Sequence, residues 1–125
     1  MSFSLDIGKF IEKSKGQEQV VVRKICLELF NKVILKSPVD TGRFRANWNA
    51  AINYPDNSVS NSLDKTGIGT IAKNNAIISN FNVNDSSIYL TNNLPYAQRL
   101  EYGWSKQAPQ GMARLSVMEI ASKYA

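Results

Sequence analysis

The stretch QEQVVVRKICLELFNKVILK, residues 17–36, decides the fold. Its apolar residues recur at steps of three and four, which predicts an amphipathic helix. The positions on its apolar face are Val21, Val22, Ile25, Leu29 and Val33. Leu27, Phe30 and Ile34 lie beside this face and widen it. The residue before a proline avoids the helical region, so the helix should end at Ser37, before Pro38.

Two later segments have the pattern of strands. Apolar and polar residues alternate over 46–54, which puts Trp48, Ala50, Ile52 and Tyr54 on one side. Residues 87–92 are rich in β-branched and aromatic residues. We expect these two segments to pair as an antiparallel sheet.

The other segments predict short helices and one long loop. Spacing favours helices over 3–14, 67–81, 94–103 and 111–124, although Asn74 and Asn75 weaken the second of these. The first helix would lie within a peripheral N-terminal region, 1–16. Residues 55–66 read as an extended loop and as an assembly contact. We therefore expect one α+β domain over 1–125, a long amphipathic helix packed on a small antiparallel sheet with flanking short helices and a C-terminal helix.

The composition argues against an enzyme. The chain has no histidine and one cysteine, Cys26, which excludes a Cys-His nucleophile and leaves too few ligands for zinc. Cys26 lies in an apolar run and should be a buried thiol. No nucleotide-binding loop or acidic pair has a catalytic spacing. We expect no catalytic residue, no cofactor and no metal. We also expect no signal peptide and no membrane contact, because no stretch approaches the roughly 20 apolar residues of a membrane span.

The segment SPVDTGRFRANW, residues 37–48, predicts a rigid corner between helix and strand. We expect Asp40, Thr41 and Gly42 to form it, with Asp40 or Thr41 as a helix cap. Asp40 could instead form an ion pair with Arg43 or Arg45. A second hypothesis concerns the basic residues of this region, which would either line a DNA channel or form an ordinary solvated surface. These residues are Lys36, Arg43 and Arg45.

A second pair of segments, YAQRLEYG (96–103) and QAPQGM (107–112), precedes the last helix. Aromatic side chains often dominate the energy of protein interfaces. We predict a subunit interface in this region, the alternative being ordinary core packing. The predicted interface residues are Tyr96, Glu101, Tyr102, Gly103, Trp104 and Pro109.

Together, in this order, these segments resemble the tailed-phage neck and tail-completion (head–tail joining) proteins, the group that includes the minor tail protein Z type. Members have a P-V-D-T-G-x-L/F-R corner, a sheet, a Y-A-x-x-x-E-x-G segment and a proline-containing loop before the last helix. The resemblance covers the chain from about residue 17 to its end, whereas residues 55–85 carry no signature of the group.

The resemblance implies a structural virion subunit of the bacteriophage neck, a head–tail connector made in the host cytoplasm. Copies would self-associate into a homo-oligomeric ring, contact neighbouring connector and tail proteins, and surround the DNA channel. A net charge of +5 suits non-specific contact with genomic DNA. The alternative is a small basic nucleic-acid-binding module, which would need a clustered basic face. A small enzyme is a third class, disfavoured by the missing histidine.

Overall fold

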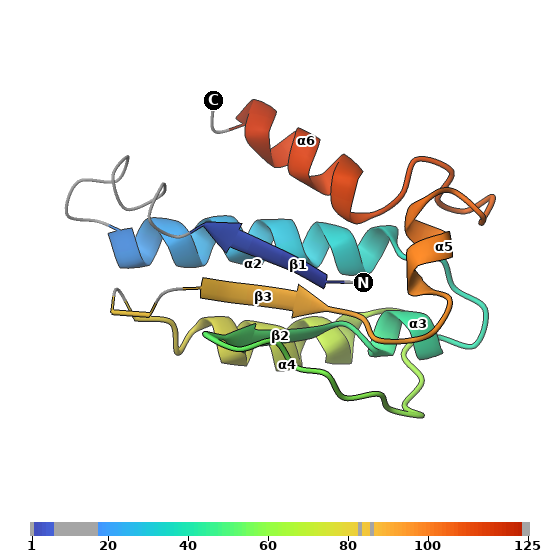
Figure 1. Cartoon of the computed structure of the whole chain (residues 1–125), viewed down its shortest axis with the longest axis horizontal. Coiled ribbons are helices and arrows are strands. Elements are labelled where there is room, and N and C mark those ends of the chain that lie inside the picture. Colours follow the sequence, from blue (N-terminus) through green and yellow to red (C-terminus); the bar gives the residue numbers. More distant parts are fainter. Residues whose placement is uncertain (1, 7–17, 83, 86, 124–125) are drawn as a thin grey trace.

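The computed structural model describes residues 2–6, 18–82, 84–85 and 87–123. It contains helices and a small antiparallel sheet, which is an α+β fold (Figure 1). The elements are β1 (Ser2–Asp6), α2 (Glu18–Lys36), α3 (Arg43–Ala46), β2 (Asn49–Ile52), α4 (Ile68–Ile78), β3 (Ser87–Thr91), α5 (Ala97–Glu101) and α6 (Ala113–Lys123). The predicted fold class is therefore confirmed.

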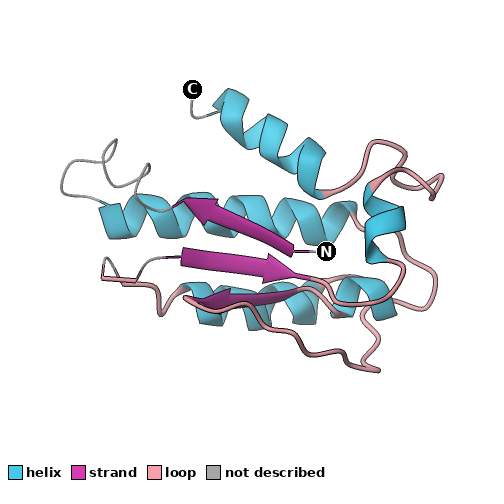
Figure 2. Ribbon diagram, in the orientation of Figure 1, coloured by secondary structure: helices cyan, strands magenta, loops and turns pink. Residues whose placement is uncertain are grey.

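The sheet has β3 at its centre, in the order β1-β3-β2, and both pairings are antiparallel (Figure 2). The predicted pairing of the two strands is confirmed, with Asn49 opposite Thr91 and Ile52 opposite Ile88. β2 is shorter than the predicted 46–54. Ala46 ends α3, and Asn53 adopts a positive φ of 68°, which stops the strand.

The predicted helix over 3–14 is wrong at its start, where the chain forms β1 and pairs with β3 from Ser2 opposite Thr91 to Asp6 opposite Ser87. The remainder of that predicted helix lies outside the described residues. In the sequence, Phe3 and Leu5 alternate with polar residues, so the same residues also fit the strand period of two. β1 is therefore part of the sheet and not a peripheral element.

The core lies between the sheet and two helices on one of its faces, α2 and α4 (Figure 1). The predicted apolar face of α2 is confirmed, because Val22, Ile25, Leu29 and Val33 are buried. Across from them, β3 buries Ile88 and Leu90. The largest buried side chain is Trp48, whose indole N–H donates to the Ser37 hydroxyl at 2.7 Å.

Cys26 is buried in this core, as the sequence predicts. Burial raises the pKa of its thiol to about 12, so the thiolate is not formed near neutral pH. The thiol is therefore a packing group.

Asp64 holds the start of α4, the helix favoured by the sequence over 67–81. Its carboxylate accepts hydrogen bonds from the Gly67 N–H at 3.0 Å and the Thr70 N–H at 2.8 Å. Burial acts to raise the pKa of Asp64, but the hydrogen bonds from Thr70, Gly67 and Thr66 outweigh it and lower the pKa. The carboxylate therefore satisfies backbone donors at the helix N-terminus and remains charged.

Asn74 of α4 covers the outer edge of β2. Its side-chain amide donates to the Trp48 carbonyl at 2.9 Å, and its amide oxygen accepts from the Ala50 N–H at 3.0 Å. Asn74 is fully buried, so these bonds lie in a dry environment. The asparagine that weakens the helical pattern is thus the residue that joins α4 to the sheet.

Residues 55–66 form the extended loop that the sequence predicts, and side chains hold it in place. The buried Asn47 amide donates to the Ser60 carbonyl at 3.0 Å and accepts from the Ser60 N–H at 2.8 Å. The Asp56 carbonyl accepts from Thr91 at 2.6 Å and from Asn93 at 2.8 Å. A loop without regular secondary structure therefore has a defined path.

α6 packs along α2, and charged groups contribute to the contact. Glu119 accepts from Lys32 at 2.8 Å and from Lys36 at 2.7 Å, while Lys123 pairs with Glu28 at 2.8 Å. The two lysines lower the pKa of Glu119 by hydrogen bonding to its carboxylate. Within the described part of the chain, no helix combines the length and apolar character needed to cross a membrane.

Candidate assembly surface

The two segments that carry the sequence signature meet at one end of the molecule, where α3 and α5 lie (Figure 1). Gln107 joins them. Its amide oxygen accepts from the Val39 N–H at 2.8 Å, and its amide nitrogen donates to the Val39 carbonyl at 3.0 Å. Phe44 also approaches Tyr96, with their ring centroids 6.0 Å apart. Segments about sixty residues apart in sequence therefore form one structural unit.

The predicted corner depends most on Gly42. Gly42 has a φ of 92°, and a Cβ placed there would lie 2.7 Å from backbone atoms of Asp64. The Gly42 carbonyl accepts from the Asp64 N–H at 3.0 Å. Any side chain at this position would combine an unfavourable backbone angle with a clash.

The capping prediction for the corner is correct only in part. The residue at the N-cap of α3 is Gly42, which has no side chain, while the Thr41 hydroxyl accepts from the Arg43 N–H at 3.3 Å. Asp40 is exposed, and among the described residues it forms neither a cap nor an ion pair with Arg43 or Arg45. Those arginines bond to backbone carbonyls instead.

The three basic residues predicted to face DNA all form bonds inside the chain. Arg45 donates to the carbonyls of Lys65 at 2.7 Å, Leu35 at 2.9 Å and Ser37 at 2.9 Å. Burial lowers the pKa of its guanidinium. Arg43 donates to the Ser60 carbonyl, and Lys36 pairs with Glu119. These residues stabilise the corner and α6, so the sequence missed a structural role for each of them.

Glu101, predicted at the subunit interface, is 4% exposed and bonds within its own chain. Its carboxylate accepts the backbone N–H groups of Met112 at 3.0 Å, Ala113 at 2.8 Å and Arg114 at 3.1 Å. The Arg114 guanidinium adds an ion pair at 3.0 Å. Glu101 therefore holds the start of α6, and its burial is inconsistent with direct contact to another subunit.

The aromatic members of the predicted interface are exposed. Trp104 is 73% exposed and Tyr102 is 61% exposed. Arg99 lies over the Trp104 ring, 5.1 Å from its centroid, and Arg114 lies over the Tyr102 ring at 4.8 Å. For Tyr102 and Trp104, the structure favours the surface interpretation over core packing.

Two glycines allow the loop between α5 and α6 to fold tightly. A Cβ at Gly103 would lie 2.5 Å from the Pro109 carbonyl oxygen, and a Cβ at Gly111 would lie at an even shorter distance from the Glu101 carbonyl oxygen. Both glycines have positive φ angles, 88° and 85°. Gly103 and Pro109 therefore shape the surface that presents the aromatic residues.

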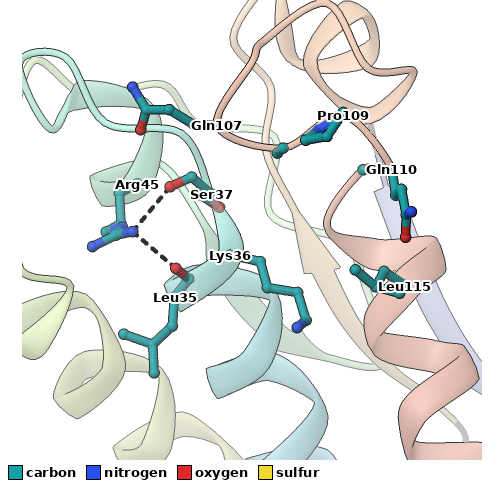
Figure 3. Close-up of a pocket in the computed structure, with 10 residues that line it drawn as sticks. Leu35, Lys36, Ser37, Arg45, Gln107, Pro109, Gln110 and Leu115 are labelled. Carbon is teal, nitrogen blue, oxygen red and sulfur yellow. Dashed lines mark hydrogen bonds between the residues drawn. The ribbon is translucent and has the colours of Figure 1, made fainter.

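Two hollows adjoin Gln107, which lines both of them. The corner hollow has a volume of about 420 Å³ and lies between residues 38–44 and Tyr96, Leu100 and Ser105. The second, which we name the α2 groove, has a volume of about 450 Å³. It lies between residues 35–37 with Arg45 on one side and residues 107–111 with Leu115 on the other (Figure 3). The predicted corner and basic residues therefore border two adjacent depressions.

Neither similarity to a known protein nor a set of metal ligands assigns a role to this surface. The chain matches no family model, no curated protein and no solved structure. Across residues 2–6, 18–82, 84–85 and 87–123, no group of three or more His, Cys, Asp or Glu side chains could hold a metal ion. This end of the molecule has buried hydrogen bonds beneath exposed aromatic side chains.

Proposed function

We propose that this chain is a structural, non-catalytic subunit of the neck of a tailed-phage particle. Copies would form a ring that joins head to tail around the DNA channel. The observation that carries this proposal is the pair of hydrogen bonds between Val39 and Gln107, at 2.8 and 3.0 Å. They hold together the two segments through which the chain resembles neck and tail-completion proteins, so these segments form one structural unit.

A ring subunit needs a rigid frame beneath its contact surface. The Gly42 carbonyl joins the corner to Asp64, the Arg45 guanidinium joins α3 to the end of α2, and the Glu101 carboxylate joins α5 to the start of α6. A rigid frame lowers the entropic cost of association, since little has to be ordered on binding. Exposed Tyr102 and Trp104 then offer side chains of the kind that dominate protein contacts.

Contact with DNA in this proposal would be non-specific. Lys36, Arg43 and Arg45 form bonds within the chain, so exposed lysines such as Lys65 and Lys106 are better placed to attract phosphate. The net charge of +5 supports this attraction without reading base sequence.

Cryo-electron microscopy of virions from the phage that carries this gene tests the proposal. We expect several copies of the chain in a ring around the DNA at the head–tail junction. Resolved neck density built entirely from other chains would overturn the proposal. The nucleic-acid-binding alternative would then be tested with the purified chain and duplex DNA over a salt series. Its expected sign is an affinity that falls steeply with salt.

A further inference from the structure

The α2 groove is suited to an acidic segment with apolar side chains (Figure 3). Leu35, Pro109 and Leu115 contribute apolar surface, and Gln107 and Gln110 contribute amides. Among the described residues that line it, none carries a carboxylate. The groove therefore combines apolar walls with the positive charges of Lys36 and Arg45.

The positive charge of the groove is only partly neutralised. Lys32 and Lys36 share the single carboxylate of Glu119, so this group of three keeps a net positive charge. Arg45 donates its hydrogen bonds to neutral backbone carbonyls, and the nearby Asp64 carboxylate offsets only part of its charge. An anionic segment would therefore meet a favourable potential in the groove.

One exposed segment of the same chain has the complementary composition. Residues 54–63, YPDNSVSNSL, contain one carboxylate, that of Asp56, and no basic residue, in a chain whose net charge is +5. Their exposed apolar side chains are Tyr54 (81%), Val59 (49%) and Leu63 (64%). Hydrogen bonds from Ser58, with a smaller contribution from the charge of Lys73, lower the pKa of Asp56, so its carboxylate is ionised at neutral pH.

The path of this segment is also fixed before any partner binds. Asn47 holds Ser60 by two hydrogen bonds, and Thr91 and Asn93 hold Asp56. Buried polar side chains are thus used to keep exposed apolar side chains in one arrangement. Preorganisation of this kind reduces the entropy lost on docking.

We propose that the α2 groove of one copy receives residues 54–63 of a second copy of this chain. In Figure 1 this loop runs along the lower edge of the molecule, whereas the groove lies between the end of α2 and the start of α6. Donor and acceptor surfaces are therefore different, and the contact joins copies head to tail. The contact between two copies is argued from the structure alone, whereas the closure of a row of copies into a ring rests on the proposed function.

Two double variants of the full chain test the contact. L35E/Q110E places carboxylates in the groove, and V59S/L63S removes apolar side chains from the loop; Leu35, Gln110, Val59 and Leu63 are all exposed, so the fold should tolerate these changes. The matched control is V20E/M118E, at exposed apolar positions elsewhere. Circular dichroism and the Tm of each variant establish that it is folded.

Sedimentation over a concentration series provides the measurement. We expect wild type and control to form species larger than a dimer as concentration rises. Each double variant should associate about tenfold more weakly or worse, because burial of one leucine changes an equilibrium constant by about that factor. Wild type that stays monomeric or stops at a dimer would overturn the proposal, as would double variants that associate like the control.

Mixing the variants tests the head-to-tail arrangement. The groove variant keeps an intact loop, and the loop variant keeps an intact groove. We expect the mixture to form a one-to-one dimer and nothing larger, since each pair of chains then retains one functional contact. A mixture in which both variants stay monomeric would overturn the proposal.

A neck ring whose subunits meet through other surfaces would refute this contact while leaving the proposed function intact. Absence of the chain from the neck would refute the function alone.

Discussion

The N-termini of α4 and α6 are both held by a carboxylate, but the two carboxylates reach their helices differently. Asp64 lies three residues before Gly67 and bonds to the turn that immediately follows it. Glu101 belongs to α5 and reaches backbone N–H groups 11 to 13 residues further along the chain. Asp64 is partly exposed, whereas Glu101 is 4% exposed. Asp64 is therefore a local cap, whereas Glu101 caps its helix through a contact between segments distant in sequence.

The largest expected effect is that of Glu101→Ala. Removal of this carboxylate leaves buried N–H groups at the start of α6 without a partner and breaks the ion pair with Arg114. We expect a loss of about 4 kcal/mol in the free energy of unfolding, measured by urea denaturation. Glu119→Ala is the matched control and should cost much less, because its ion pairs are partly exposed to solvent. Equal losses of stability in Glu101→Ala and Glu119→Ala would show that the buried carboxylate contributes no more than a partly exposed ion pair.

Gly42→Val should have the next largest effect, about 3 kcal/mol, because it combines a positive φ with a close approach to Asp64. The control is Gly69→Ala. Gly69 lies inside α4, where a Cβ would make only an ordinary contact at 3.6 Å, so alanine should stabilise the helix by about 0.5–1 kcal/mol. Thermal unfolding of both variants gives the comparison. A Gly42→Val protein that melts like wild type would show that the corner tolerates a side chain.

Asp64→Ala should cost about 1 kcal/mol, the usual effect of losing a side-chain cap. The loss is smaller than for Glu101→Ala because water can replace the carboxylate at this partly exposed helix end. Urea denaturation at neutral pH measures it. A loss as large as that of Glu101→Ala would mean that Asp64 also anchors the corner at Gly42.

The smallest effect should appear as a pH dependence. The pKa of Asp64 is lowered in the folded protein, so its contribution to stability is complete above the ordinary aspartate pKa of about 3.9. That contribution is lost as the pH falls through the folded-state pKa. The stability difference between wild type and Asp64→Asn should therefore shrink below about pH 4. A difference that stays constant down to pH 2 would contradict this assignment.

Local patterns in the sequence predicted most of the secondary structure. The apolar face of α2, the pairing of β2 with β3 and the helical turn before Gly103 all follow from residue spacing and turn chemistry. β1 was missed because five residues fit either period, and the choice was made by the available edge of β3, which is a tertiary effect.

The polar residues of the candidate surface were less predictable. Gly42 was identified from its place in a turn, but the roles of Glu101 and Arg45 depend on partners distant in sequence. Amides were the hardest to interpret. Asn47, Asn74 and Gln107 each bond to both a backbone N–H and a backbone C=O of another segment. Composition alone assigns such residues to loops, and nothing in their local spacing identifies the segment that each one holds.

The amide of Asn74 has a consequence for copies of this chain held at high local concentration. A strand at the edge of a sheet exposes N–H and C=O groups that can pair with a strand from another molecule and start aggregation. Asn74 occupies the carbonyl of Trp48, just before β2, and the N–H of Ala50 within it. Neighbouring copies therefore cannot join at these positions by extending the sheet. One buried amide thus protects the β2 edge of the sheet from pairing with a strand of another molecule at Trp48 and Ala50.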